Sequence, residues 1–182
     1  MLGQTALWDA ALRCHAAQDE AAIPHAVIGG VAVCLHGYQR TTVDLDLLIR
    51  PEDGTSALCI FAQAEFVWNA QFAEFRVNNG ISVDLHYSGV AIGLDGHLQL
   101  PDPTSPHVVQ MIEGLPVLRL ERLIEIKTAI GINNRRRAHR EFADVVELAA
   151  VNMLRHSFAR QLHASLRKSF RILVNVAQGD SP

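Results

Sequence analysis

The feature that most constrains the fold is "IGGVAVCLHGYQRTTVDLDLLI", which runs from Ile28 to Ile49. Two glycines follow its apolar start, and two aspartates appear later inside a second apolar run. Side chains at positions i and i+2 of a strand point to the same face of a sheet. We therefore expect a strand over 42–49 in which Asp44 and Asp46 share one face. The opposite, core-facing side of that strand would consist of Val43, Leu45, Leu47 and Ile49.

A second segment with the same alternation, "ISVDLHYS", occupies residues 81–88 and places Asp84 and His86 on one face. If the two strands are neighbours, Asp84 lies beside Asp44 and Asp46. Three carboxylates on one face repel one another unless a cation lies between them, and such oxygen ligands suit Mg²⁺ or Mn²⁺. The pattern therefore favours a metal site over the alternative, the solvated face of an antiparallel sheet.

Gly29 and Gly30 stand between a predicted strand, 25–28, and a predicted short helix that ends near Gly37. A glycine pair at such a junction lets backbone N–H groups approach a phosphate closely. The pair alone is also typical of a plain turn. It gains meaning from the aspartates, which follow after an interval of 13 residues.

The remaining pattern predicts an α+β fold, with a small mixed sheet flanked by helices and a C-terminal helical segment. We expect a core domain over 1–120 and a helical segment over 121–182 that packs on it. The other expected elements are helices over 5–22, 51–66, 121–131, 138–154 and 158–177, strands over 72–77, 81–88 and 115–120, an Asn79-Gly80 turn, and a loop over 89–107 with an edge strand at 96–100.

Charge is distributed unevenly along the chain. Residues 1–120 hold 5 Lys/Arg and 13 Asp/Glu, whereas residues 121–182 hold 11 and 6. This asymmetry suggests an anionic partner. The basic cluster over 135–140 is suited to an RNA acceptor, although a solvated charge run explains it as well.

No segment reaches the roughly 18 apolar residues that a membrane span requires. The three cysteines, Cys14, Cys34 and Cys59, lie among apolar residues and lack the spacing of metal ligands. We interpret them as reduced core cysteines, which predicts a cytoplasmic location without membrane association.

The order "IGG", 13 residues, "DLD" resembles the signature of the nucleotidyltransferase superfamily, which has the DNA polymerase β-like fold. The pattern Arg-x-Thr-x-Asp-x-Asp, formed by Arg40, Thr42, Asp44 and Asp46, is most similar to compact bacterial nucleotidyltransferases of the AbiEii toxin-like and related uncharacterised groups.

A later segment, "LERLIEIKTAIGINNRRRAHREFADVVEL", resembles the family's lysine-bearing helix and the Arg/Asp-rich helix that follows it. Lys127, Arg137 and Asp144 take the matching positions. Glu141 departs from the pattern, because relatives often carry an aspartate there. Together the matches span roughly residues 25–150.

The resemblance implies transfer of a nucleoside monophosphate from an NTP, such as ATP, to a hydroxyl acceptor, with release of pyrophosphate. The acceptor would be RNA (for example tRNA), a protein or a small hydroxylated molecule, and the partner a second copy or a cognate antitoxin. The implied catalytic and metal-binding residues are Asp44, Asp46 and Asp84, with Mg²⁺ or Mn²⁺ as cofactor, and the implied nucleotide-binding residues are Gly29, Gly30, Arg40, Thr42 and Lys127.

Two other function classes compete with this one. A catalytically weak nucleotide-binding or toxin–antitoxin partner protein would keep the same fold, but the complete set of aspartates favours the enzyme. A metal-dependent phosphohydrolase is disfavoured, because His139 and Asp144 lie five residues apart and do not share a helical face.

Overall fold

The computed structural model describes residues 2–63, 66–71, 74–76, 80–92 and 98–179. The chain divides into two compact units. The sheet unit comprises Met1–Ala32, Arg40–Ser88 and Pro101–Leu118, and the helical unit comprises Val33–Gln39, Gly89–Leu100 and Arg119–Pro182. None of the described helices has the length and apolar character needed to cross a membrane.

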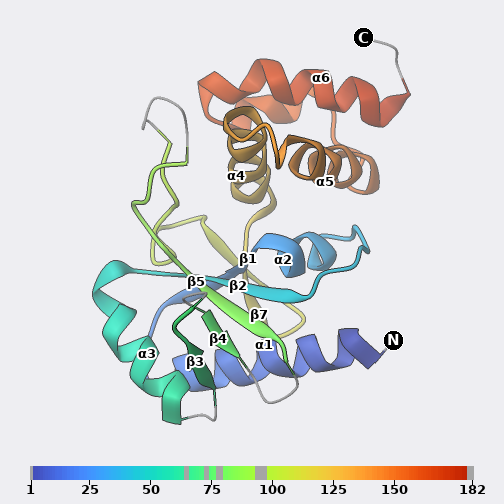
Figure 1. Cartoon of the computed structure of the whole chain (residues 1–182). Helices are drawn as coiled ribbons and strands as arrows, with labels where there is room; N and C mark the ends of the chain where they lie inside the picture. The colour runs from blue at the N-terminus through green and yellow to red at the C-terminus, as the bar shows by residue number, and fades with distance from the viewer. Residues whose placement is uncertain (1, 64–65, 72–73, 77–79, 93–97, 180–182) are drawn as a thin grey trace. The chain divides into compact units, whose positions relative to one another are not determined.

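The sheet unit is built on a mixed sheet whose seven described strands follow the order β3-β4-β5-β2-β1-β7-β6 (Figure 1). Two neighbouring pairs, β2 with β5 and β1 with β7, are parallel, and the other pairs are antiparallel. The strands are β1 (His25–Ile28), β2 (Asp44–Ile49), β3 (Val67–Asn69), β4 (Glu74–Arg76), β5 (Ser82–Tyr87), β6 (Val109–Ile112) and β7 (Leu115–Leu118).

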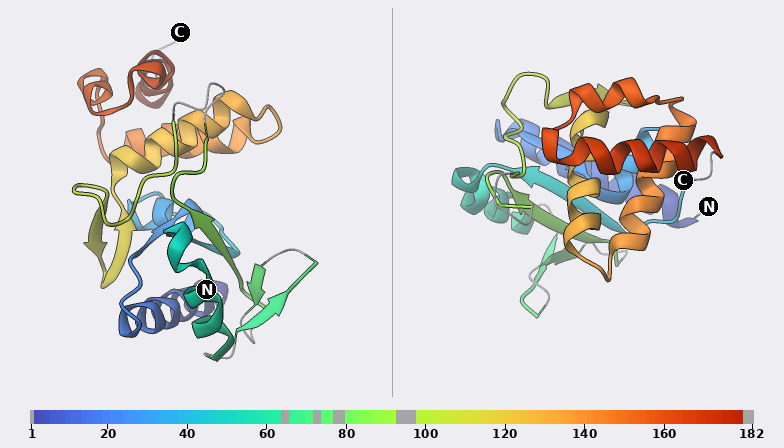
Figure 2. Two further views of the ribbon diagram at one scale, coloured as in Figure 1. Left: turned by 90° about the vertical axis from the view of Figure 1, so that its left-hand side faces the viewer. Right: turned by 90° about the horizontal axis from the view of Figure 1, so that it is seen from above.

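One face of this sheet is covered by two helices, α1 (Leu2–Glu20) and α3 (Gly54–Gln63), which lie side by side (Figures 1 and 2). The short 3₁₀ turn η1 (Pro51–Asp53) leads into α3. Ala57 of α3 packs against Ile49, with Leu85 and Tyr87 of β5 beside them. Full burial of a large aliphatic side chain such as that of Ile49 contributes about 1.5–3 kcal/mol through removal from water.

The predicted core face of β2 is confirmed for Leu45, Leu47 and Ile49, which are fully buried. Val43 was assigned wrongly, because its side chain is 70% exposed. The strand begins only at Asp44, so the alternation that would direct Val43 inward does not yet apply. The aspartates of β2 therefore occupy the face opposite to α1 and α3.

The helical unit consists of α4 (Leu120–Asn133), α5 (Ala138–Val151), two 3₁₀ turns, η2 (His156–Gln161) and η3 (Ala164–Leu166), and α6 (Arg167–Gln178). Phe142 of α5 packs onto Gly131 of α4, where an added Cβ would lie 2.5 Å from the ring. In the turn between these helices, Oδ1 of Asn134 accepts hydrogen bonds from two backbone N–H groups. Phe170 and Val174 of α6 are buried. The short helix α2 (Gly29–Leu35) contributes residues to both units.

The α+β class is confirmed, and several element boundaries differ from expectation. The predicted helix over 158–177 is wrong before Arg167, where η2 and η3 replace it. Leu162 is extended, and the N–H of His163 donates to the carboxylate of Glu125 in α4, a contact that local sequence does not reveal. β3 and β6 were not predicted.

Other expectations fall partly outside the described residues. These are the Asn79-Gly80 turn, the ends of the 72–77 strand and part of the 96–100 strand, of which Gln99 forms an isolated antiparallel bridge with Ala91. The cysteines are free, but Cys59 is exposed, so the expectation of a core position is wrong for this residue.

Candidate active site

The Asp46 carboxylate lies directly against Gly29. β1 and β2 are antiparallel with Ile28 opposite Asp46, so the first residue of α2 meets the aspartate. Gly29 has φ +62°, and a Cβ added to it would lie 1.8 Å from Oδ2 of Asp46. Glycine adopts this left-handed conformation readily and leaves the space that the carboxylate occupies. The first glycine of the motif and the second aspartate therefore form one packed unit.

The second glycine meets the Arg-x-Thr part of the motif. A Cβ on Gly30 would lie 2.3 Å from Oγ1 of Thr42 and 3.1 Å from Nη2 of Arg40. The same Thr42 hydroxyl donates to Oδ1 of Asp44 at 3.0 Å. The glycine pair, the arginine, the threonine and both aspartates thus meet at the start of β2.

Asp84 joins this group through the pairing of β5 with β2. The two strands are parallel and in a register that places Asp46 opposite Asp84, so the carboxylates lie on one face. Burial raises the pKa of Asp84 above its ordinary value of 3.8, and the negative charge of Asp46 raises it further, while His86 opposes the shift. The fold therefore places negative charges close together at this position, and their proximity disfavours the ionised form of the Asp84 carboxyl.

His86 is a member of the group whose partner the sequence did not reveal. Its Nε2 lies 2.8 Å from Oδ1 of Asp46. The signal that could have identified the contact was its position two residues after Asp84, on the same face of β5, combined with the parallel register. In that register His86 stands opposite Leu48, one step diagonally from Asp46.

The donor set fits a hard divalent cation, because Asp44, Asp46 and Asp84 offer carboxylate oxygens on one face. Burial, and then the charge of Asp46, raise the pKa of Asp84, and a cation would offset both effects. Within the described part of the chain, no three His, Cys, Asp or Glu side chains converge as a ready-made metal cage. One oxygen of Asp44 accepts from Thr42, and one oxygen of Asp46 contacts His86.

Lys127, the fifth predicted nucleotide-binding residue, belongs to the helical unit, where its side chain is buried between two acids. Its Nζ lies 2.9 Å from Oε2 of Glu141 and 2.7 Å from Oδ2 of Asp144. Arg137 binds the other oxygen of Glu141 at 2.7 Å. The family-like lysine and the Arg/Asp-rich helix thus form a buried ion network, and the predicted contact of Lys127 with nucleotide stays a prediction.

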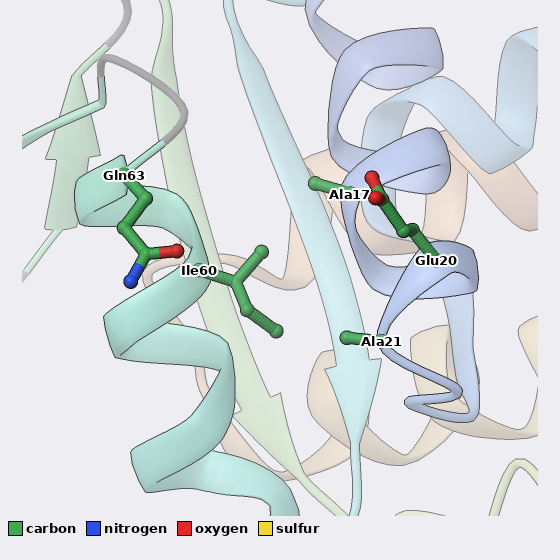
Figure 3. A pocket seen from close by; sticks show the side chains of 5 residues that line it. All are labelled: Ala17, Glu20, Ala21, Ile60 and Gln63. Carbon is green, nitrogen blue, oxygen red and sulfur yellow. The ribbon is translucent and has the colours of Figure 1, made fainter.

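The rest of the basic cluster is exposed at the junction of α4 and α5, through Arg135, Arg136, His139 and Arg140. The expectation that this cluster binds RNA stays a prediction too. A pocket of about 340 Å³ lies elsewhere, in the sheet unit between α1 and α3. Its lining side chains come from Ala17, Glu20, Ala21, Ile60 and Gln63 and include none of the predicted site residues (Figure 3).

The fold is that of known nucleotidyltransferases. The antibiotic-resistance factor ANT(2'')-Ia, solved with adenylyl-2''-tobramycin, aligns with 88% of this chain and 94% of its own, at 16% identity and a TM-score of 0.57. A putative nucleotidyltransferase from Thermotoga maritima aligns with 77% of this chain and 94% of its own, at 16% identity and a TM-score of 0.56. A putative nucleotidyltransferase from H. pylori aligns with 92% of this chain and 91% of its own, at 14% identity and a TM-score of 0.55.

At these identities the likeness concerns the fold. No family model matches the chain, and no curated protein matches it significantly. The chain therefore has the nucleotidyltransferase fold, as the GG and DxD elements predicted, and its activity has to be inferred from the site.

Proposed function

We propose that this protein is a Mg²⁺-dependent nucleotidyltransferase that moves a nucleoside monophosphate from an NTP to a hydroxyl acceptor. The observation that carries the proposal is the meeting of Asp44, Asp46 and Asp84 on one sheet face, with Gly29 packed against Asp46. Without a cation, repulsion between the carboxylates of such a cluster destabilises the fold. Their oxygen atoms suit Mg²⁺ or Mn²⁺ as the cation. The nucleotidyltransferase fold supports the same function.

Each site residue has a proposed role. Asp44, Asp46 and Asp84 would hold the divalent cations, which neutralise phosphate charge when bound. Gly29 and Gly30 would present backbone N–H groups to the triphosphate, because they stand at the junction between β1 and α2. Arg40, beside Gly30, would add positive charge to the same phosphates, and Thr42 orients Asp44.

The transfer requires few protein groups besides these. The acceptor oxygen attacks the α-phosphorus, a new P–O bond forms, and the bond from that phosphorus to the bridging oxygen breaks as pyrophosphate leaves. The acceptor hydroxyl must lose its proton. Asp84 either completes the cation site or, if it binds no cation, is our candidate for the base, because burial and the charge of Asp46 raise its pKa and a stronger base accepts the proton more readily.

Three classes of molecule are candidates for the hydroxyl acceptor. A small hydroxylated molecule is supported by ANT(2'')-Ia, whose structure holds an adenylylated tobramycin. RNA such as tRNA is supported by the exposed arginines between α4 and α5. A protein hydroxyl is the third candidate.

Partner and location are also proposals. A homodimer is supported by α6, where Ile172 and Val176 of the apolar stretch 170–176 are about half exposed. A cognate antitoxin is the other candidate partner. The free cysteines agree with a reducing compartment such as the cytoplasm.

The first test is calorimetric titration of each NTP, with and without Mg²⁺, into the wild type and the Asp44→Ala/Asp46→Ala variant. We expect Mg²⁺-dependent binding of at least one NTP to the wild type and none to the variant. The bound NTP, labelled at the α-phosphate, is then incubated with a tRNA pool, with protein, and with hydroxylated antibiotics to identify the acceptor.

Absence of binding for every NTP in the presence of Mg²⁺ would contradict the proposal. Binding without label transfer or pyrophosphate release would instead favour the alternative, a catalytically weak nucleotide-binding or toxin–antitoxin partner protein. Equal binding by the wild type and the double variant would place the nucleotide elsewhere on the chain.

A further inference from the structure

His86 makes a contact that the proposed chemistry does not itself require. Its Nε2 lies 2.8 Å from Oδ1 of Asp46, across from β5 to β2. An ionised carboxylate offers only hydrogen-bond acceptors, so the bond exists only when Nε2 carries the proton and donates it. His86 therefore donates its Nε2–H to the Asp46 carboxylate.

Asp46 is restrained from two sides. Oδ1 accepts from His86, and Oδ2 fills the space left by the missing Cβ of Gly29. Asp44 is held in a similar way, because Oγ1 of Thr42 donates to its Oδ1. Each aspartate of the DxD pair thus has a neighbour that orients its carboxylate before any cation arrives.

Metal-binding carboxylates are commonly hydrogen-bonded by groups behind them, and these partners orient the ligand oxygen. We propose that His86 is a positioning residue, whose Nε2–H orients the Asp46 carboxylate for the divalent cation. The inference rests on the proposed function, because it assumes that Asp46 binds a cation. It adds a residue outside the GG and DxD elements to the site.

The local geometry explains why a histidine suits this position. Opposite residues of β2 and β5 are Asp46 with Asp84 and Leu48 with His86, so the histidine must reach diagonally to Asp46. The imidazole spans that diagonal and presents its Nε2–H at the far end of the ring. Its side chain is 39% exposed, so replacing it removes little packing.

Two variants separate the N–H donor from the bulk of the ring. His86→Gln keeps a side-chain N–H donor of similar reach, whereas His86→Phe keeps a planar ring without a donor. His156→Phe is the matched control, since His156 is an exposed histidine of η2 in the helical unit whose Nε2 also contacts a side-chain oxygen, Oδ1 of Asn175, at 2.6 Å. All variants are made in the full chain, and thermal unfolding without metal checks that they fold.

The measurement is binding of Mn²⁺ alone, followed by the electron paramagnetic resonance signal of the free ion. We expect His86→Phe to bind Mn²⁺ about 10–100-fold more weakly than the wild type. His86→Gln should recover most of that loss, and His156→Phe should match the wild type.

Wild-type affinity in His86→Phe would overturn the positioning role while leaving the proposed function intact. Equal loss in the Gln and Phe variants would also overturn it, because the N–H donor would then not be the active feature. No Mn²⁺ binding by the wild type would reject the cation site itself, and with it both the proposed function and this inference.

A second measurement does not depend on the variants. A long-range ¹H–¹⁵N spectrum of the metal-free wild type reports which ring nitrogen of His86 carries hydrogen. We expect a protonated Nε2. A neutral ring protonated only at Nδ1 would overturn the proposal even if the Phe variant failed to fold.

Discussion

Both units of the molecule contain a group of acidic side chains, and the two groups are neutralised very differently. In the helical unit, Glu141 and Asp144 are almost fully buried, and the Lys127 ammonium lies within 2.9 Å of both. Arg137 adds a second cation on Glu141. The group balances two negative charges with two positive charges from the chain itself.

In the sheet unit, the chain supplies less positive charge than negative charge. Asp44, Asp46 and Asp84 share one face, and burial together with their mutual repulsion raises the pKa of Asp84. Thr42 and His86 orient individual carboxylates by hydrogen bonds. A charge-balanced cluster joins elements of a fold, whereas an unbalanced one costs stability and indicates a site that takes its counter-charge from a ligand.

The largest expected effect is on catalysis and concerns the sheet unit alone. Asp46→Asn should lower nucleotidyl transfer by at least about 100- to 1,000-fold, because it removes a carboxylate that would hold the cations needed to neutralise the phosphates. The free energy of unfolding of the metal-free protein should not fall. Pyrophosphate release and chemical denaturation check the two statements, and near-wild-type turnover would contradict the account of the site.

The second prediction tests the balanced cluster. Lys127→Met should lower the free energy of unfolding by about 3–5 kcal/mol, because two buried acids lose their ammonium. Arg137→Met, the same change at a side chain that is 55% exposed, should cost no more than about 1 kcal/mol. Urea denaturation measures both.

The Lys127→Met variant also distinguishes a structural role of this lysine from a role in nucleotide binding. If Lys127→Met left stability unchanged and instead reduced NTP affinity tenfold or more, the lysine would serve the nucleotide directly. Lys127 would then act in nucleotide binding and not, as its contacts with Glu141 and Asp144 indicate, in stabilising the helical unit.

The third prediction concerns the glycine packed against Asp46. Gly29→Ala should cost about 1–2 kcal/mol of stability for the left-handed backbone alone and should also displace Asp46 and weaken Mn²⁺ binding. Gly114→Ala is the control, because Gly114 has φ +81° with nothing within 4 Å of an added Cβ. Its stability loss should be similar, with Mn²⁺ binding intact. Equal Mn²⁺ affinity in both variants would contradict the proposed link.

The smallest expected effect has the opposite sign. Asp84→Asn should stabilise the metal-free protein at neutral pH, by no more than about 1 kcal/mol because water screens this half-buried group. The folded-state pKa lies above 3.8, so the cost of the aspartate develops as pH rises through that pKa and the gain should vanish well below pH 3.8. Thermal unfolding across pH measures this, and destabilisation at neutral pH would show that the cluster is already balanced.

Local pattern was sufficient to predict one part of the site. The alternation around Asp44 and Asp46 and the glycines before them predicted the strand–helix–strand segment, because these signals depend on residues close in sequence. The place of Asp84 beside Asp46 could be predicted only conditionally. Which strands become neighbours, and in which register, depends on packing between distant segments.

The side-chain contacts in which the two units differ could be predicted less well from the sequence. Glu141 and Asp144 are three residues apart on α5, a spacing that indicates a shared face, but nothing local names Lys127 as their partner. The pairing of Glu125 with the backbone of His163, which accompanies the change from helix to 3₁₀ turns, is a tertiary contact of the same kind.

The most direct test of the central claim is the anomalous diffraction of a crystal grown with Mn²⁺ and a non-hydrolysable NTP analogue. We expect a Mn²⁺ peak coordinated by carboxylate oxygens of Asp44 and Asp46, on the sheet face that also carries Asp84. Clear density for the analogue without Mn²⁺ at these aspartates, or Mn²⁺ bound only elsewhere on the chain, would contradict the claim that their unbalanced charge marks a cation site.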